Sequence, residues 1–253
     1  KFVPITVTLN GDLLSYMVSV VGFTYPITVD PTTTFVDTDA KTGLMHNSTV
    51  VSWDAARNAT SSSDSYSSLI YVGRYYEVAP VFKNNRAPIL FDTSALPNTA
   101  IISAATVKFV METKSVNSQF YLDLIKGTFS GTLGVDWYND LDGWAASGAY
   151  TPTLIADSLY TDVAIGDTLT FTLNAAGLAS ISKTDSTIFM LVGSPDIYNN
   201  AAPAAGSHYC ILEDDSPYMQ ITYTAYVQKV NGILIPNKVN GVANANIKTV
   251  NGK

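Results

Sequence analysis

The chain has 253 residues, of which 47% are hydrophobic and 14% charged, and its 21 acidic residues outnumber its 14 lysines and arginines, giving a formal net charge of -7. No run of about 18 apolar residues is present, so the sequence predicts no membrane-spanning helix, and the acidic balance argues against nucleic acid as a partner. The single cysteine, Cys210, excludes an intrachain disulfide. We interpret it as a small buried side chain rather than a nucleophile.

Residues 1–50 contain several strand-like runs and are expected to form a segment of their own, a candidate assembly arm. One face of the strand predicted over 2–9 carries the apolar side chains of Val3, Ile5, Val7 and Leu9. So apolar a face needs a sheet to cover it, and the backbone donors of the strand need partners as well. Addition to an exposed sheet edge, on its own domain or on a neighbouring subunit, would satisfy both needs.

Residues 51–226 are expected to form an all-β, antiparallel jelly-roll β-sandwich. Many short runs rich in β-branched and aromatic residues alternate with clusters of Gly, Pro, Asn, Asp and Ser, the pattern typical of a sandwich or barrel. The residues expected to share one buried core are Phe91, Val107, Phe109 and Ile221. One short helix is predicted within 173–183, with Asn174 as its N-cap, and a single helical turn within 136–147.

The densest acidic loop of the sandwich lies in DWYNDLDGW, residues 136–144. Asp136, Asp140 and Asp142, followed by a glycine, supply the closely spaced oxygen ligands that Ca²⁺ uses, although the EF-hand spacing is absent. Calcium is therefore the one candidate cofactor, and a solvated acidic turn is the alternative.

Aromatic residues flank these acids. Trp137, Tyr138 and Trp144, beside carboxylates that accept hydroxyl hydrogen bonds, form a candidate glycan-binding surface. The alternative is that these large rings fill the core.

A second acidic cluster is formed by Glu213, Asp214 and Asp215. Two carboxylates serve glycoside hydrolysis only at a defined separation, and neighbours in a tight turn rarely converge in that way. P-loop, GxSxG, HExxH and CxxC motifs are absent from the sequence. We therefore expect a protein without enzymatic activity.

The tail, residues 227–253, differs from the preceding chain. Val-Asn-Gly occurs three times, beginning at Val230, Val239 and Val250, and each copy has a lysine shortly before it. Because Asn-Gly readily accepts positive φ, the copies fit a repeating turn. The tail has too little apolar surface to order alone, so we expect it to pack on its own domain or on another chain.

Three motifs in order carry a family resemblance: RAPILFDTSALPNTAIISAATVKFV from residue 86, FTLNAAGLASISK from 171 and SPYMQITYTA from 216. Together they resemble the DNRLRE-type, carbohydrate-binding-like jelly-roll domains over roughly residues 50–225. The matching positions are Arg86, 91–97, 102–105, 171–174, 177–178, Pro217 and 221–224. The resemblance implies a sandwich secreted or displayed outside cells, of the kind found in polysaccharide-associated bacterial proteins and in phage virion proteins. It implies no catalytic residues.

We interpret this signature as a set of residues that support the fold rather than a functional site. Asp92 and Ser94 suit a turn in which a side chain binds nearby backbone N–H groups. Arg86 is expected to form a buried ion pair, with Asp92 or with another carboxylate.

The leading interpretation is a non-enzymatic structural subunit of a virion, as a phage capsid-surface, fibre or tail component, or of an extracellular filament. It would lie on the virion surface or outside cells and assemble through its termini with itself or with other subunits. The alternative is a carbohydrate-binding module of a polysaccharide-processing or surface-attachment protein, with surface polysaccharide as its partner. A hydrolase comes third.

Overall fold

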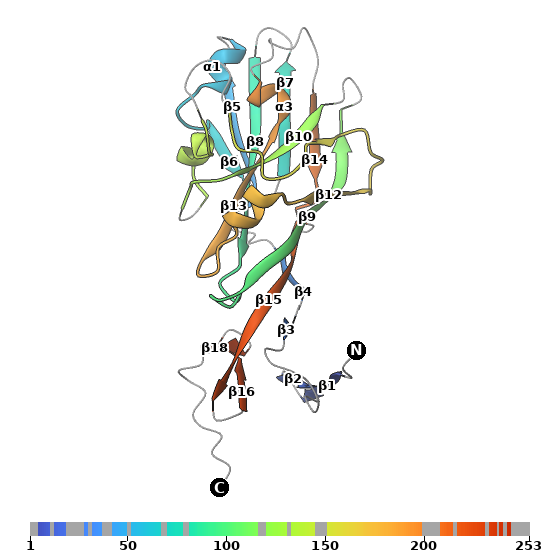
Figure 1. The fold of residues 1–253 in the computed structure, drawn as a ribbon. Helices are drawn as coiled ribbons and strands as arrows, with labels where there is room; N and C mark the ends of the chain where they lie inside the picture. Colours follow the sequence, from blue (N-terminus) through green and yellow to red (C-terminus); the bar gives the residue numbers. More distant parts are fainter. Residues whose placement is uncertain are drawn as a thin grey trace.

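The structure is a computed structural model in which the chain forms mainly antiparallel β-strands (Figure 1). It describes residues 5–10, 13–18, 28–29, 32–36, 42–49, 52–66, 70–77, 81–115, 120–130, 133–144, 151–198, 208–214, 217–230, 233–236, 238–239 and 242–243.

Antiparallel strands dominate the fold, as the alternating sequence pattern predicted. In chain order they are β1 (Ile5–Asn10), β2 (Leu13–Val18), β3 (Thr28–Val29), β4 (Thr32–Val36), β5 (Leu44–Thr49), β6 (Asp64–Tyr66), β7 (Ile70–Glu77), β8 (Val81–Asp92), β9 (Ile101–Lys114), β10 (Tyr121–Lys126), β11 (Leu159–Tyr160), β12 (Thr168–Thr172), β13 (Ser186–Gly193), β14 (His208–Leu212), β15 (Tyr218–Val230), β16 (Ile233–Pro236), β17 (Lys238–Val239) and β18 (Val242–Ala243).

Most of these strands belong to one large curled sheet, ordered β11-β10-β13-β8-β7-β14-β9-β15-β16, with β12 and β4 pairing on β9 and β15. The sheet folds over so that inward side chains of β8 and β13 share a core with those of β9, β12 and β15. All four residues predicted for this core, Phe91, Val107, Phe109 and Ile221, are fully buried in it. The predicted all-β antiparallel sandwich is confirmed.

The connection between β8 and β9 contains the turn predicted from the signature. The backbone N–H of Ser94 donates to Asp92 Oδ1 at 3.0 Å, an Asx-type turn. The Thr93 hydroxyl lies 2.7 Å from that of Thr187 on β13, and Leu96 is buried in the core. The turn is therefore part of the frame.

Short helices connect some of the strands. The predicted helix is α2 (Ala175–Ser180), whose N-cap Asn174 accepts a hydrogen bond from the Gly177 N–H at 3.0 Å, and the predicted helical turn is the 3-10 helix η1 (Val135–Asn139). Two others, α1 (Trp53–Arg57) and α3 (Ser194–Ile197), were not predicted. No helix in the described part of the chain is long and apolar enough to cross a membrane.

The sheet reaches beyond the boundaries expected at residues 51 and 226. In front of residue 51, β4 pairs with β15 and β5 pairs with β8. At the other boundary β15 continues without interruption to Val230. Both ends of the expected sandwich are thus connected by hydrogen bonds to segments outside it.

The terminal strands form hairpins. β15 pairs with β16 through Val230 and Ile233, and β17 pairs with β18 through Val239 and Val242. Each pairing leaves only Asn-Gly between the strands, the spacing that the predicted repeating turn requires. The third copy, which begins at Val250, lies outside the described residues. At the other end of the chain β1 pairs with β2, with Asn10 opposite Leu13.

Candidate functional site

A cluster of buried polar side chains lies where α1, η1 and α3 meet β8. Two arginines, Arg57 and Arg86, have no exposed surface, and Asp196 is only 2% exposed. These residues lie next to a second apolar cluster that includes Leu90, Met190 and Val192, on the opposite face of β8 and β13 from the main core. Charged groups so deeply buried require partners, and the geometry supplies them.

Arg86 and Asp196 form a bidentate ion pair. Arg86 Nε donates to Asp196 Oδ2 at 2.6 Å, and Nη2 donates to Oδ1 at 2.9 Å. The planar guanidinium fork matches a carboxylate in this way, which a lysine ammonium does not. The structure thus identifies the partner of Arg86 as Asp196 rather than Asp92.

The remaining donors of Arg86 are also used. Nη1 donates to the Tyr138 carbonyl at 2.6 Å and to Asn139 Oδ1 at 2.9 Å, and Nη2 donates to the Arg57 carbonyl at 3.0 Å. Guanidinium has five N–H groups, so every one of them has an acceptor. The same group lies over the rings of Tyr138 and Trp144, 4.1 and 4.4 Å from their centroids, in cation–π contact.

Arg57 extends the cluster from α1. Its guanidinium hydrogen-bonds the carbonyls of Asp196 and Ile197 and the side chain of Asn58, and its Nε lies 3.5 Å from Asp196 Oδ1. Two guanidiniums therefore share one carboxylate, and backbone carbonyls together with the amide oxygens of Asn58 and Asn139 supply the other acceptors. The cluster connects three short helical elements to β8.

Tyr138 closes the cluster from η1. Its hydroxyl accepts from Asn84 Nδ2 at 2.8 Å and donates to the Ala56 carbonyl at 3.0 Å. Burial, the largest effect, raises the pKa of Tyr138 well above its usual value although Arg86 opposes it. The phenol therefore stays protonated, and its hydroxyl links Asn84 on β8 to Ala56 in α1.

The aromatic residues predicted to bind glycans are instead mainly structural. Tyr138 is fully buried and Trp137 is 5% exposed, and Trp137 stacks on Phe129 with centroids 4.3 Å apart. Trp144 is partly exposed and contacts the arginine pair. The glycan-binding prediction for Trp137 and Tyr138 is therefore corrected, because their ring faces are covered by protein.

The three acids of the candidate calcium loop lie near one another in sequence but do not gather into one cluster. No group of three or more His, Cys, Asp or Glu side chains suited to a metal occurs among the described residues. The pKa of Asp140 is raised by burial and then by the charge of Asp136. Asp142 is held by its backbone N–H to the Lys126 carbonyl.

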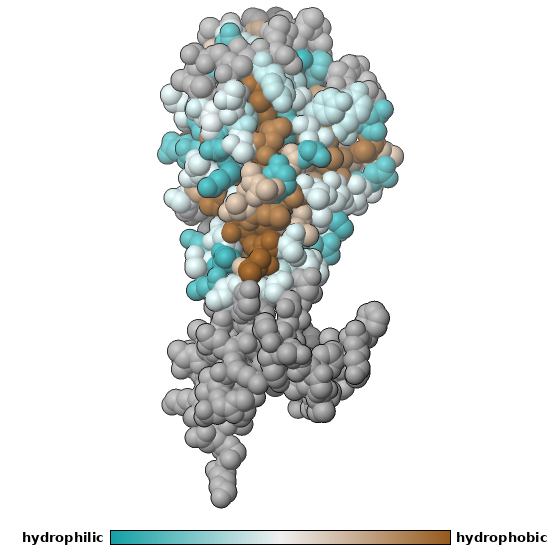
Figure 2. Space-filling view, viewed as in Figure 1, coloured by the Kyte–Doolittle hydropathy of each residue, from teal (hydrophilic) through white to brown (hydrophobic). Residues whose placement is uncertain are grey.

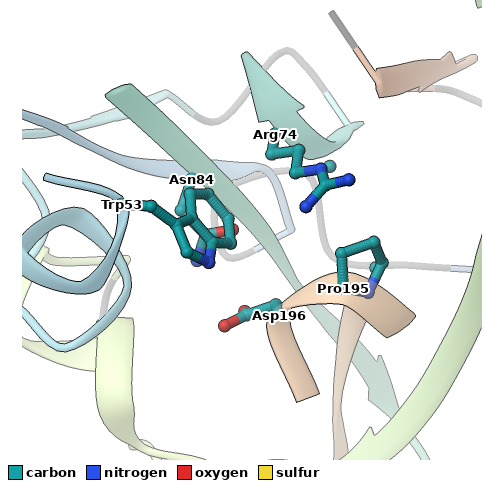
Figure 3. Close-up of a pocket in the computed structure, with 7 residues that line it drawn as sticks. Trp53, Arg74, Asn84, Pro195 and Asp196 are labelled. Carbon is teal, nitrogen blue, oxygen red and sulfur yellow. The ribbon is translucent and has the colours of Figure 1, made fainter. Parts of the chain in front are cut away.

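A small hollow adjoins the arginine cluster (Figure 3), where Trp53, Arg74 and Asn84 lie opposite Pro195 and Asp196 of α3. The space has no room for a water molecule. Trp53 is 3% exposed, its indole N–H lacks an acceptor, and the Arg74 guanidinium lies 5.8 Å from its ring centroid. The hollow is a packing defect at the edge of the cluster rather than a ligand pocket.

The other candidate groups are separated. Cys210 is buried in the main core, and burial raises the pKa of its thiol to about 12, so it remains protonated. His208, on the same strand, is partly exposed, and its pKa is lowered by burial and then by Arg74. Glu213 and Asp214 are exposed, and Asp215 lies outside the described residues.

One buried carboxylate was not predicted. Asp123 on β10 is 1% exposed; Ser158 donates a short hydrogen bond to its Oδ1, and its Oδ2 has no hydrogen-bond partner. Burial raises the pKa of Asp123, and the Ser158 hydrogen bond lowers it less. Its alternation with Leu122 and Leu124 gave a signal for a strand but none for this burial.

The surface adds two apolar features. Figure 2 shows hydrophobic side chains gathered in a band over the region of α2 and β13. An open groove of about 350 Å³ adjoins α2 and is lined by Ala100, Ile101, Ile102, Leu178, Ala179, Ile181 and Lys183. Elsewhere, Tyr121 and Tyr160 face each other across β10 and β11 with ring centroids 4.9 Å apart, and they are 49% and 42% exposed.

No protein-family model matches the chain, and a search of curated proteins finds no match. The resemblance to DNRLRE-type domains therefore rests on the motifs themselves.

Proposed function

We propose that the protein is a non-enzymatic structural subunit of a virion or extracellular filament that assembles through its terminal strands. The observation that carries this proposal is the course of β15. Its first half pairs with β9 inside the sandwich, ending with Thr224 opposite Ile101, and its second half continues outward and pairs with β16 from Val227 to Val230.

The terminal hairpins support assembly by strand addition. β1 pairs with β2 and β17 with β18, each as a sheet of two strands among the described pairings. Isolated two-stranded hairpins are marginally stable in water and gain stability from a third strand or an apolar cover. Their unpaired edges are ready templates for another chain, which suits a subunit more than a soluble enzyme.

The end of the sandwich where β15 leaves is also apolar. Ile101 is 53% exposed and forms part of the groove beside α2. In Figure 1, β1, β2, β16 and β18 all lie beyond that end of the sandwich. Exposed apolar surface next to unpaired strand edges is typical of an interaction surface.

The buried arginine cluster fits a frame rather than a catalyst. Every donor of Arg86 already has an acceptor within the protein, so none is free to polarise a substrate. The cluster fixes α1, η1 and α3 to the sheet, which gives the body the rigidity a structural subunit needs. The resemblance to domains found in phage virion proteins agrees with this proposal.

Terminal deletion tests the proposal. Removal of 227–253, or of 1–15, should leave a folded body that still unfolds cooperatively on heating but lower the mass measured by light scattering to that of a monomer. A matched variant that replaces Gly232 and Gly241 with valine keeps the tail and its charges while disfavouring the two Asn-Gly turns. If both deletions assemble like the full chain, the proposal is wrong.

Carbohydrate binding is the second candidate, and one observation favours it. Tyr121 and Tyr160 present two adjacent exposed rings at the edge of the sheet, an arrangement on which a sugar ring can stack. A glycan array should then give binding that Tyr121→Ala and Tyr160→Ala abolish. Binding that survives both substitutions would exclude this surface.

A further inference from the structure

The charges of the chain are divided unevenly between the tail and the rest. The tail, 227–253, contains four lysines and no acidic residue, so its formal net charge is +4. The preceding 226 residues therefore contain ten lysines and arginines against 21 acidic residues, a net charge of -11. Opposite charges of this size on two parts of one chain favour contact between a tail and a body.

Four exposed acidic residues lie at one level of the sandwich, as backbone hydrogen bonds show. The carbonyl of Asp167, just before β12, accepts from the N–H of Met111 on β9. On the other side of β9, the N–H of Glu213 donates to the Val110 carbonyl. Together with Glu112 on β9 itself, these residues form an acidic belt across three neighbouring strands. The belt comprises Glu112, Asp167, Glu213 and Asp214, all exposed.

The tail of the same chain leaves from the far end of β9. β15 runs antiparallel to β9 and passes Ile101 as it exits, whereas the belt lies near Glu112. Eleven residues of strand at about 3.3 Å each separate the two points by roughly 35 Å. The direction of β15 carries the tail away from the belt, toward β16 and β18 at the opposite end in Figure 1.

We propose that the basic tail of one copy docks on the acidic belt of a second copy. This inference rests on the proposed function and adds the identity of the partner surface. Lys229 on β15 and Lys238 on β17, each directly before a Val-Asn-Gly copy, provide the cationic contacts. Nucleic acid would also attract four lysines, but the body with its charge of -11 would repel it.

Such an interface joins two different surfaces of the same chain. A contact of this kind is head-to-tail, so it closes into a ring if the rotation allows and otherwise grows as a polar filament. A pair in which tail meets tail is not expected, because like charges would then oppose each other.

The test is sedimentation velocity of the full chain with charge-reversal variants. Lys229→Glu with Lys238→Glu should weaken association at least about tenfold, because like charges then face the belt. Glu112→Lys with Glu213→Lys should weaken it similarly, and the two pairs combined should restore it. Matched controls reverse exposed charges elsewhere on the body, at Lys126 and Asp54, and should leave association unchanged. Raising NaCl from about 0.05 to about 0.5 M should also weaken association.

The outcomes separate this inference from the proposed function. If deletion of 227–253 abolishes assembly while both charge reversals leave it intact, the belt is not the partner surface and the proposed function stands. If deletion of 227–253 leaves assembly intact, this inference fails, and the proposed function fails as well only if deletion of 1–15 also leaves assembly intact. Assembly that nuclease treatment abolishes would point to nucleic acid and overturn the inference. A full chain that sediments as a monomer at all concentrations would overturn both proposals.

Discussion

Arg86 on β8 and Asp196 in α3 form a bidentate ion pair although 110 residues separate them in sequence. The pair is buried, and the guanidinium lies over the rings of both Tyr138 and Trp144. Because α3 has only four residues, it lacks the length to be stable alone. Its position depends on Asp196, and that of η1 depends on the Tyr138 carbonyl that Arg86 also binds.

The first prediction concerns this pair. Asp196→Asn leaves two buried guanidiniums without their carboxylate, so it should lower the free energy of unfolding by about 3–5 kcal/mol. Arg86→Lys keeps the charge but loses the planar fork, and should also be clearly destabilising. Urea denaturation measures both effects. Asp157→Asn, at an exposed acid, is the control and should stay within about 0.5 kcal/mol of the natural protein. A similarly small effect of Asp196→Asn would contradict the structural role of the cluster.

The second prediction concerns the main core. Phe109 is fully buried and meets Phe171 edge to face, with ring centroids 5.9 Å apart. Phe109→Ala should therefore cost about 3–5 kcal/mol in unfolding free energy. Ile165→Ala removes a side chain that is 66% exposed and provides the comparison. A loss below about 1 kcal/mol at Phe109, against the cost expected for a buried aromatic ring, would show that the two halves of the sheet do not pack there.

The third prediction separates the two interpretations of the aromatic loop. Trp137 is buried and stacked on Phe129, so Trp137→Ala should destabilise the protein by about 3–5 kcal/mol. Thermal unfolding checks this expectation. If Trp137→Ala changed glycan binding but left the melting temperature unchanged, the glycan-binding interpretation of Trp137 would be supported instead.

The sequence predicted those features that depend on local alternation or on turn chemistry. Val107 and Phe109 lie inward and Lys108 lies outward because strand side chains alternate. In the tail, β15 and β16, like β17 and β18, pair with only Asn-Gly between them, as the turn preference of Asn-Gly predicts. Long-range partners were not predictable: nothing near Asp196 indicates that a helix of four residues brings it to Arg86. Whether Trp137 is buried or exposed could not be predicted either, since aromatic rings occur both in cores and on surfaces. The packing of η1 determines that it is buried.

The last prediction concerns the dependence of stability on pH. Burial raises the pKa of Asp123 above its ordinary value of 3.8, so the folded state holds a proton that the unfolded state has already released. Stability from this group is present at acidic pH and is lost as pH rises from about 3.8 through the higher folded value. Asp123→Asn cannot ionise. We therefore expect the unfolding free energy of Asp123→Asn, relative to that of the natural protein, to increase as pH rises from acidic to neutral. Urea denaturation measures both values.

Ser158 supplies the companion variant for this prediction. Its hydroxyl donates to Asp123 Oδ1 and opposes the effect of burial on the pKa. Ser158→Ala should therefore raise the pKa of Asp123 further, and stability should fall over a wider pH range, and by more in total, than in the natural protein. The two substitutions change this total loss in opposite directions although each removes part of the same hydrogen bond. Parallel curves for all three proteins would show that Asp123 reaches solvent and does not ionise inside the sheet.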